Sequence, residues 1–405
     1  MSLKLAYFVT HPIQYQAPLL RRVAALPGLD FKVFFGSDFS ARAFVDPDFG
    51  RAIQWDVPLL DGYAHEVLDQ WGAPLAANEI PTVWRPFSKG LAQKLRAGKF
   101  DALWIHGYNR ASHWVAAATA KMLGIKVLMR DESTEISAER SAVKQIVKQV
   151  FFTSIDKVVD RWLTIGDLNA AYYRGFGIAP HKLIPVPYAV DNAYFQSKIA
   201  ALSPQREVLR ASLGLEPGRP IILFAAKLID RKQPLPLLGA FAELVHDDDA
   251  RKPYLLYAGD GPQRGALEKT IALSGLGESV KVLGFKGQAD LAALYDLCDI
   301  FVLPSEREAW GLVVNEAMNA GRAIVCSDRI GAAPDLVVPG LNGHIYPFGN
   351  DTALTAALRD CLVDPERLAA MGQASLDRIN QWSFDQDLDG LCRALRETTG
   401  VEIRP

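Results

Sequence analysis

The sequence predicts an α/β protein made of two doubly wound parallel-sheet domains in tandem. Its 405 residues are too many for one ordinary core. Short apolar runs alternate with amphipathic helical stretches, and this alternation occurs twice along the chain. Uninterrupted apolar runs between helices are typical of parallel strands that are covered on both faces. A hydrophobic content of 49% and a charged content of 22% are ordinary for a globular protein.

The strands of the first domain are predicted from runs rich in β-branched and aromatic residues. These runs occupy residues 4–10, 31–36, 64–68, 101–106, 126–130, 161–165 and 183–187. The strands of the second domain are predicted at residues 221–226, 254–258, 280–284, 300–304, 323–327 and 343–347. The stretches between them, such as 235–246 and 289–297, have helical periodicity.

The boundary between the domains is predicted near Pro185–Asp191, where two prolines disfavour regular pairing. We expect a first domain at 1–188 and a second at 189–383, joined by a connector with one short helix. A final helix at about 384–405 is expected to return to the first domain after a break near Trp382. Ligands of such sheets bind beyond the carboxyl ends of the strands, so we expect the site in a cleft between the domains.

Cysteine usage and the N-terminal segment lead us to expect a cytoplasmic protein. Four cysteines are scattered without a CxxC pair, so we expect buried, reduced thiols. No leader is evident, and no run reaches the roughly 18 apolar residues of a membrane span. Residues 1–190 hold 22 Lys and Arg against 17 Asp and Glu, with basic clusters at 89–99 and at Lys144 and Lys148. These clusters indicate either peripheral contact with the inner face of a membrane or a solvated helix face.

Two strand ends of the second domain carry candidate phosphate-binding residues. Lys227, Arg231 and Lys232 follow the first strand, where each hydrogen bond to a diphosphate would contribute about 1.5–3 kcal/mol. Gly259 and Gly261 follow the next strand and allow a tight turn close to a ligand. The alternatives are a solvated basic loop and a simple helix-capping turn.

A third strand end carries two acids, one before and one after a predicted helix start. The helix begins near Gly311, so the N–H groups of Gly311, Leu312 and Val313 could bind phosphate. Glu316 lies about one turn into the helix, and Glu308 stands in the preceding loop. These acids could hold a donor hexose and a nucleotide ribose. The alternative for Glu316 is an acid favoured by the helix dipole.

The order of these motifs resembles the family 4 glycosyltransferases of the GT-B fold. The resemblance covers nearly the whole second domain, continues weakly through the first, and rests on Lys227, Lys232, Gly259–Pro262, Leu283–Phe285, Glu308, Glu316 and Gly331–Asp335. It implies two Rossmann-like domains and the transfer of a hexosyl group from a nucleotide sugar with retention of anomeric configuration. We expect the donor to be a UDP-sugar or a GDP-sugar. It implies neither a metal nor a cofactor. The acceptor would be a glycan, a lipid-linked sugar or a small molecule, as in cell-surface polysaccharide biosynthesis, and no nucleic acid is expected.

The resemblance also implies roles for individual residues. Lys227 and Lys232 match the Arg and Lys that hold the donor diphosphate. Lys227 keeps the positive charge of that Arg but cannot donate the paired hydrogen bonds of a guanidinium group. Glu308 matches the acid on the donor sugar, Glu316 the acid on the ribose, and Gly311 with the following amides the phosphate contact. Such groups would stabilise negative charge on the departing diphosphate, so Glu308 and Lys232 are predicted to be catalytic.

The first domain departs further from the family pattern. A His-containing loop stands at 10–18 in place of a Gly-rich one, and Arg130 follows a strand where His is usual. We expect His106 and Arg130 at the reacting centre, with Arg130 as a donor-sugar or phosphate ligand. On the acceptor side we expect His11, Gln14 and Asp131, with Glu132 as the next carboxylate. The alternatives are packed histidines and helix-capping acids.

The same sequence leaves rival functions to consider at particular residues. Asp46–Asp48 and Asp247–Asp249 contain Asp-x-Asp strings that could hold a metal. A dinucleotide site is disfavoured because Arg264 stands where the third glycine of the fingerprint belongs. A sugar-nucleotide epimerase of the same architecture and a non-catalytic sugar-nucleotide-binding protein stay open. The non-catalytic protein would be expected to lose Glu308 or Lys232, and both are present.

Overall fold

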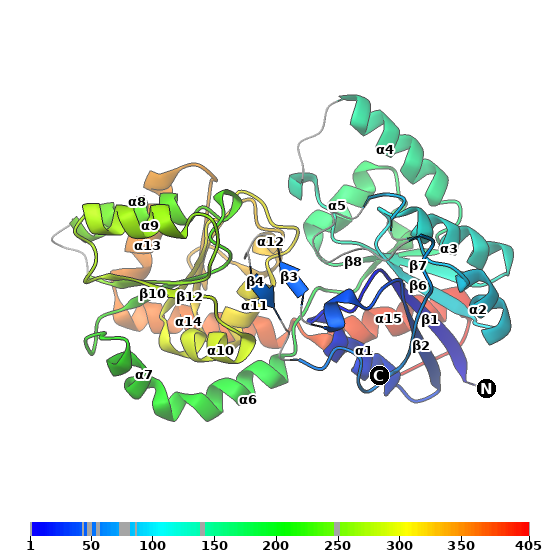
Figure 1. Cartoon of the computed structure of the whole chain (residues 1–405), viewed down its shortest axis with the longest axis horizontal. Helices are drawn as coiled ribbons and strands as arrows, with labels where there is room; N and C mark the ends of the chain where they lie inside the picture. The colour runs from blue at the N-terminus through cyan, green and yellow to red at the C-terminus, as the bar shows by residue number, and fades with distance from the viewer. Residues whose placement is uncertain are drawn as a thin grey trace. The chain divides into compact units, whose positions relative to one another are not determined.

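The computed structural model (Figure 1) describes residues 2–42, 44–46, 51–53, 57–72, 82–85, 87–137, 142–246 and 252–404. Its described residues form two compact units. Unit 1 contains the residues up to Tyr188 together with those from Phe384 onward, and unit 2 runs from Ala189 to Ser383.

Unit 1 is a seven-stranded parallel sheet in the order β5-β2-β1-β6-β7-β8-β9. Its strands are β1 (Leu3–Val9), β2 (Leu29–Phe35), β5 (Ala64–Val67), β6 (Ala102–His106), β7 (Lys126–Arg130), β8 (Arg161–Thr164) and β9 (Leu183–Pro185). Its helices are α1 (Gln16–Ala24), α2 (Leu91–Gly98), α3 (Ala111–Met122), α4 (Ala142–Ile155), α5 (Asp167–Gly175) and α15 (Phe384–Thr399). Figure 1 shows α3, α4 and α5 on one face of this sheet and α1 and α15 on the other.

Unit 2 is a six-stranded parallel sheet in the order β12-β11-β10-β13-β14-β15. Its strands are β10 (Ile221–Ala225), β11 (Tyr254–Ala258), β12 (Val280–Gly284), β13 (Ile300–Leu303), β14 (Ala323–Ser327) and β15 (Gly343–Tyr346). Helices α8 (Pro234–His246), α9 (Arg264–Leu273) and α13 (Asp351–Leu362) pack on one face. The other face carries α6 (Asn192–Leu202), α7 (Arg206–Ser212), α10 (Gln288–Leu297), α11 (Leu312–Asn319) and α14 (Pro365–Asn380), and the four-residue α12 (Ala333–Leu336) follows β14.

Each unit has its own apolar core, which explains why its strands are uninterrupted apolar runs. In unit 1, Phe152 of α4 and Trp162 of β8 are completely buried, and their ring centroids lie 5.7 Å apart. In unit 2, the core includes Phe241 of α8 and Leu358 of α13, together with buried side chains of β10 and β11. Burial of both faces of each sheet supplies the hydrophobic stabilisation that parallel sheets require.

The predicted strands and the two parallel sheets are confirmed, with two differences of detail. A short antiparallel hairpin, β3 (Phe44–Asp46) with β4 (Arg51–Ile53), was not predicted. The connector after Ala189 contains two helices, α6 and α7, where one was predicted. The four cysteines are free and buried, as predicted. In the described part of the chain, no helix is long and apolar enough to cross a bilayer.

Candidate active site

The candidate site in unit 2 lies where its sheet changes winding direction. The neighbouring strands β10 and β13 lead into helices α8 and α11 on opposite faces of the sheet. At such a switch point the loops after the two strands diverge and leave room for a ligand. The loop after β10 carries Lys227 and Lys232, and the loop after β13 carries Glu308.

Lys232 and Glu308 meet at this switch point. The ammonium group of Lys232 donates a hydrogen bond to Oε1 of Glu308, and the side chains are only 14% and 13% exposed. Arg231 Nη1 lies 3.7 Å from the same carboxylate oxygen and donates to the carbonyl of Arg307 at 3.1 Å. Burial lowers the pKa of Lys232, while the charge of Glu308 opposes this shift. The arrangement places two cations and one carboxylate in a partly desolvated site.

The two glycines after β11 bring that loop against the basic loop. A Cβ on Gly259 would lie 1.9 Å from the carbonyl oxygen of Ala226, and one on Gly261 would lie 2.6 Å from that of Leu228. The amide of Leu228 also donates to the carbonyl of Asp260 at 2.9 Å. Close packing of the two loops therefore explains both glycines. Their predicted contact with a donor stays a prediction, as does that of the partly buried Lys227.

Helix α11 begins directly after Gly311, as the sequence predicted. Gly311 is the N-cap residue with φ of 98°, a left-handed conformation that favours glycine. The N–H groups of Leu312 and Val313 belong to the first turn, which has no intrahelical acceptors for them. The preceding Trp310 is buried, donates from Nε1 to Asn315 at 2.9 Å and stacks on Trp382. These contacts hold the helix start and its amides in place.

Glu316 lies on the second turn of α11 in a mostly buried environment. The hydroxyl of Tyr295 in α10 donates to Glu316 Oε2 at 2.8 Å. Burial raises the pKa of Glu316 to about 7, and the hydrogen bond from Tyr295 partly offsets this rise. Tyr295, which the sequence did not single out, therefore orients this carboxyl group.

Unit 1 has a second polar cluster at its own switch point, between β1 and β6. Tyr7 donates to Gln16 Oε1 at 2.8 Å, and the Gln16 amide nitrogen lies 2.9 Å from Nε2 of His106. His106 Nε2 lies 3.5 Å from Oε1 of Glu132, and the Tyr188 hydroxyl donates to the same oxygen. Burial opposes ionisation of Glu132, yet its contacts with His106 and Tyr188 and the charge of Arg130 hold its pKa below the ordinary value.

Arg130 occupies a buried structural position. Its guanidinium lies 3.2 Å from Asp387 in α15 and donates to the carbonyls of Val186 and Pro187, both at 3.1 Å. The side chains of Arg130 and Asp387 are 2% and 1% exposed. These contacts hold α15 and the end of unit 1 against the sheet, which differs from the predicted contact with substrate.

The other acceptor-side candidates lie at the same edge of the sheet. His11 packs its ring 4.7 Å from that of Phe39, and burial lowers its pKa to about 4. Gln14 is partly buried in the same loop. Asp131 accepts a hydrogen bond from the amide of Ser133 at 2.7 Å, and burial raises its pKa. The carboxylate that contacts His106 is therefore Glu132 and not Asp131.

No group of three potential metal-ligating side chains occurs among the residues that the structure describes. Of the two Asp-x-Asp strings, Asp48 and the whole of Asp247–Asp249 lie outside the described residues.

Comparison with known proteins shows similarity to glycosyltransferases. Residues 205–378 match the family model described as glycosyl transferases group 1. A D-inositol 3-phosphate glycosyltransferase of Segniliparus rotundus is 28% identical over 336 residues, which are 80% of this chain and 72% of the relative. An alpha-D-kanosaminyltransferase of Streptomyces kanamyceticus is 32% identical over 178 residues, and the match covers less than half of either chain, 44% of this one and 45% of the relative.

Solved structures of similar fold cover almost the whole chain. The crystal structure of Anabaena Alr3699/HepE in complex with UDP has a TM-score of 0.71 at 16% identity and covers 98% of this chain and 100% of its own. A glycosyltransferase from Rickettsia africae has a TM-score of 0.74, also at 16% identity, with 98% of each chain covered. The two parallel-sheet units have the fold of GT-B glycosyltransferases, and the group 1 match together with these relatives supports a glycosyltransferase of the family 4 type.

Proposed function

We propose that this glycosyltransferase moves a sugar from a nucleoside-diphosphate sugar to an acceptor hydroxyl, with retention of anomeric configuration and without a metal. The observation that carries the proposal is the buried Lys232–Glu308 pair beside the start of α11. In the reaction, the bond between the anomeric carbon and the diphosphate oxygen breaks and a bond to the acceptor oxygen forms. The nucleoside diphosphate departs with the electron pair of the broken bond, and the hydroxyl proton passes from the acceptor to it or to solvent.

The charges of the site suit a departing diphosphate. Lys232 and Arg231 supply two cations, and the amides of Leu312 and Val313 supply directed N–H donors at a helix start. In a partly buried site such groups stabilise developing negative charge more strongly than they would in water. We propose metal independence because these groups supply the positive charge that a metal ion supplies to other phosphate-binding sites.

The two acids have separate roles in the proposal. Glu308 binds hydroxyls of the transferred sugar, since it stands beside the cations that would hold the diphosphate. Glu316, oriented by Tyr295, binds the ribose hydroxyls. A uridine nucleotide is the first candidate donor because similar structures were solved in complex with UDP and with UDP-glucose.

The polar cluster of unit 1 is proposed to orient the acceptor. His106 and Glu132 stand at the carboxyl ends of β6 and β7, and Gln16 and Tyr188 hold them from either side. Arg130 is proposed as a positioning residue, since its guanidinium already binds Asp387 and two carbonyl groups.

The test is nucleotide release from UDP-, GDP- and ADP-sugars in the presence of EDTA, with the released sugar followed by proton NMR. We expect release from one nucleotide class, unaffected by EDTA, with the released sugar first appearing in the anomeric configuration of the donor. Loss of activity in EDTA that added Mg²⁺ restores would contradict metal independence. A product epimerised at carbon 2 of the sugar would favour the epimerase instead.

A peripheral membrane contact is also proposed, on one observation from unit 1. Val143, Ile146, Val147 and Val150 follow helical spacing along α4 and are 62–69% exposed. Lys144 is exposed on the same helix, while Lys148 donates to the hydroxyl of Tyr108 at 3.0 Å. An exposed apolar stripe beside a basic residue is typical of helices that lie on anionic lipid surfaces.

The contact is tested by co-sedimentation with vesicles of phosphatidylglycerol and phosphatidylcholine. Wild type is expected to sediment and Ile146→Gln to stay in the supernatant. Met122→Gln, a change at an 80% exposed apolar residue on α3, is the control. Equal sedimentation of wild type and Ile146→Gln would contradict the proposal.

A further inference from the structure

Unit 2 contains a pocket at the edge of its sheet opposite to the Lys232–Glu308 pair. Pro220, Asp299 and Arg322 line it, and each immediately precedes a strand, β10, β13 or β14 respectively. Because all strands of this sheet are parallel, their amino ends lie at the edge away from the candidate donor site. The pocket has a volume of about 480 Å³, within the range of small-molecule sites.

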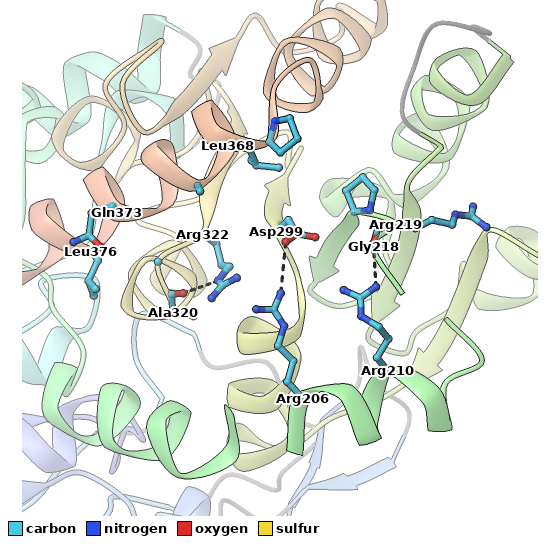
Figure 2. Close-up of a pocket in the computed structure, with 14 residues that line it drawn as sticks. Arg206, Arg210, Gly218, Arg219, Asp299, Ala320, Arg322, Leu368, Gln373 and Leu376 are labelled. Atoms are coloured by element: carbon cyan, nitrogen blue, oxygen red, sulfur yellow. Dashed lines mark hydrogen bonds and ion pairs between the residues drawn. The ribbon is translucent and has the colours of Figure 1, made fainter. Parts of the chain in front are cut away.

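The lining is rich in arginine. Arg206, Arg210, Arg219 and Arg322 line the pocket, and Asp299 is the one acidic residue in its wall. Figure 2 shows Arg206 and Arg210 extending from α7 toward the strand starts, with the side chain of Arg322 directed toward Arg206 from the other wall. Three further carboxylates, those of Glu207, Glu216 and Asp296, pair with arginines at 3.3–3.9 Å from outside the lining.

Arg206 and Arg210 are held by backbone carbonyls, and each keeps an N–H group without an acceptor among the described residues. Arg210 donates from Nη1 to the carbonyls of Glu216 and Arg219 at 3.1 and 3.0 Å. Arg206 donates from Nη2 to the carbonyl of Leu297 at 3.1 Å and lies 3.5 Å from Asp299. The Nε atoms of both arginines are buried without a hydrogen-bond partner in the described part of the chain. The side chain of Arg210 is only 7% exposed. Oε1 of Glu207 lies 3.7 Å from the Nε of Arg210, which is beyond hydrogen-bond distance.

A buried donor without an acceptor is costly. A phosphate group offers acceptors to such donors, because its oxygens accept paired hydrogen bonds from planar guanidinium groups. The wall formed by α14 is partly apolar, with Leu368, Ala369 and Leu376. Such a wall suits the carbon skeleton that carries the phosphate.

We propose that this arginine pocket binds a small phosphate monoester at a site separate from that of the sugar donor. The two sites stand at opposite ends of one helix. Gly311 begins α11 at the donor site, and Ala320 and Gly321, just beyond the end of α11, line the arginine pocket. An eight-residue helix is about 12 Å long, so α11 separates the two sites.

The proposal is tested by titration calorimetry of the full-length protein with inorganic phosphate, glucose 6-phosphate and glucose at constant ionic strength. Phosphate and glucose 6-phosphate are expected to bind at one saturable site, and glucose is not. Arg206→Gln removes one guanidinium group from the lining, and Ala369→Glu adds a carboxylate at an exposed position in the wall without removing an arginine. Each variant is expected to weaken binding at least about tenfold.

Two controls separate this site from other anion sites. Arg174→Gln removes an exposed arginine of unit 1, and Lys232→Gln removes one of the two cations of the candidate donor site. Both are expected to bind glucose 6-phosphate as wild type does, and circular dichroism spectra check that every variant is folded. The proposal is overturned if wild type shows no saturation up to about 10 mM. It is equally overturned if Arg206→Gln and Ala369→Glu bind normally, or if Lys232→Gln abolishes binding.

Discussion

The ammonium group of Lys232 donates a hydrogen bond to the carboxylate of Glu308, although the residues lie on different loops of unit 2. Both side chains are mostly buried, so neither charge is fully compensated by water. Arg231 is the second cation near this carboxylate, at 3.7 Å. The pair concentrates both signs of charge where β10 and β13 separate, and this suits a ligand with a diphosphate and a hydroxylated sugar.

Glu308→Gln is expected to lower kcat for donor hydrolysis roughly 100-fold. The neutral amide holds sugar hydroxyls less strongly as charge develops at the anomeric carbon. UDP affinity should be retained or increase, since Lys232 no longer faces a carboxylate. Steady-state kinetics with UDP titrations measure both quantities, with Glu306→Gln in the same loop as the matched control. Normal turnover in Glu308→Gln would remove this residue from the active site.

Glu316→Gln is expected to stabilise the protein increasingly as pH rises. Burial raises the pKa of Glu316 from 4.5 to about 7, so ionisation costs free energy in the folded state. This cost is absent below the unfolded pKa, grows between the two values and is complete above about pH 7. Glutamine keeps an acceptor for Tyr295 and removes the cost, which is up to about 3 kcal/mol at about pH 8.

Urea unfolding of wild type and Glu316→Gln at several pH values between about pH 5 and about pH 8 measures this difference. The exposed Glu278→Gln on the same unit is the control. A stability difference between wild type and Glu316→Gln that stays constant with pH would argue against an ionisation at this residue.

Glu132→Gln is expected to separate acceptor transfer from donor hydrolysis. The lowered pKa keeps Glu132 ionised, and its carboxylate orients His106 from a distance of 3.5 Å. Because this cluster belongs to unit 1, transfer should fall roughly 10- to 100-fold while donor hydrolysis changes little. The assay compares nucleotide release with and without a mixture of sugar acceptors. The exposed Glu135→Gln is the control, and equal loss of both activities would be the contrary result.

Arg130→Met is expected to destabilise the protein by about 3–5 kcal/mol, since it leaves the Asp387 carboxylate buried without a partner. Arg161→Gln is the matched control, because Arg161 also joins the sheet to α15, through Glu397 at 3.1 Å. That pair is more exposed, and its loss should cost about 0–1 kcal/mol. The double variant with Asp387→Leu should recover much of the stability, as measured by urea unfolding. Equal, small costs for both single variants would contradict a structural role for Arg130.

The sequence was informative about the sheets because each parallel strand is a continuous apolar run. It was also informative about the start of α11, since the turn before the helix requires a positive φ that only Gly311 supplies readily. The β3–β4 hairpin was missed because its three-residue strands are too short for a periodic signal.

Pairings between distant residues could not be predicted. Arg130 meets Asp387 across 257 positions, and no local pattern marks the pair. Likewise Gln16 and Tyr188 reach His106 and Glu132 only through the topology of the sheet. The role of Gly259 could not be predicted either. Its sequence context is typical both of contact with a ligand and of close packing against another loop, and the structure shows packing against the carbonyl of Ala226.

Binding of nucleoside diphosphates to Lys232→Ala tests the central claim most directly. Titration calorimetry with UDP, GDP and ADP compares wild type, Lys232→Ala and the control Lys269→Ala, whose side chain is exposed on α9. We predict that one nucleotide binds wild type and Lys269→Ala alike, and that Lys232→Ala binds it at least about tenfold more weakly. Equal affinity in wild type and Lys232→Ala, or no binding of any of the three to wild type, would contradict the account.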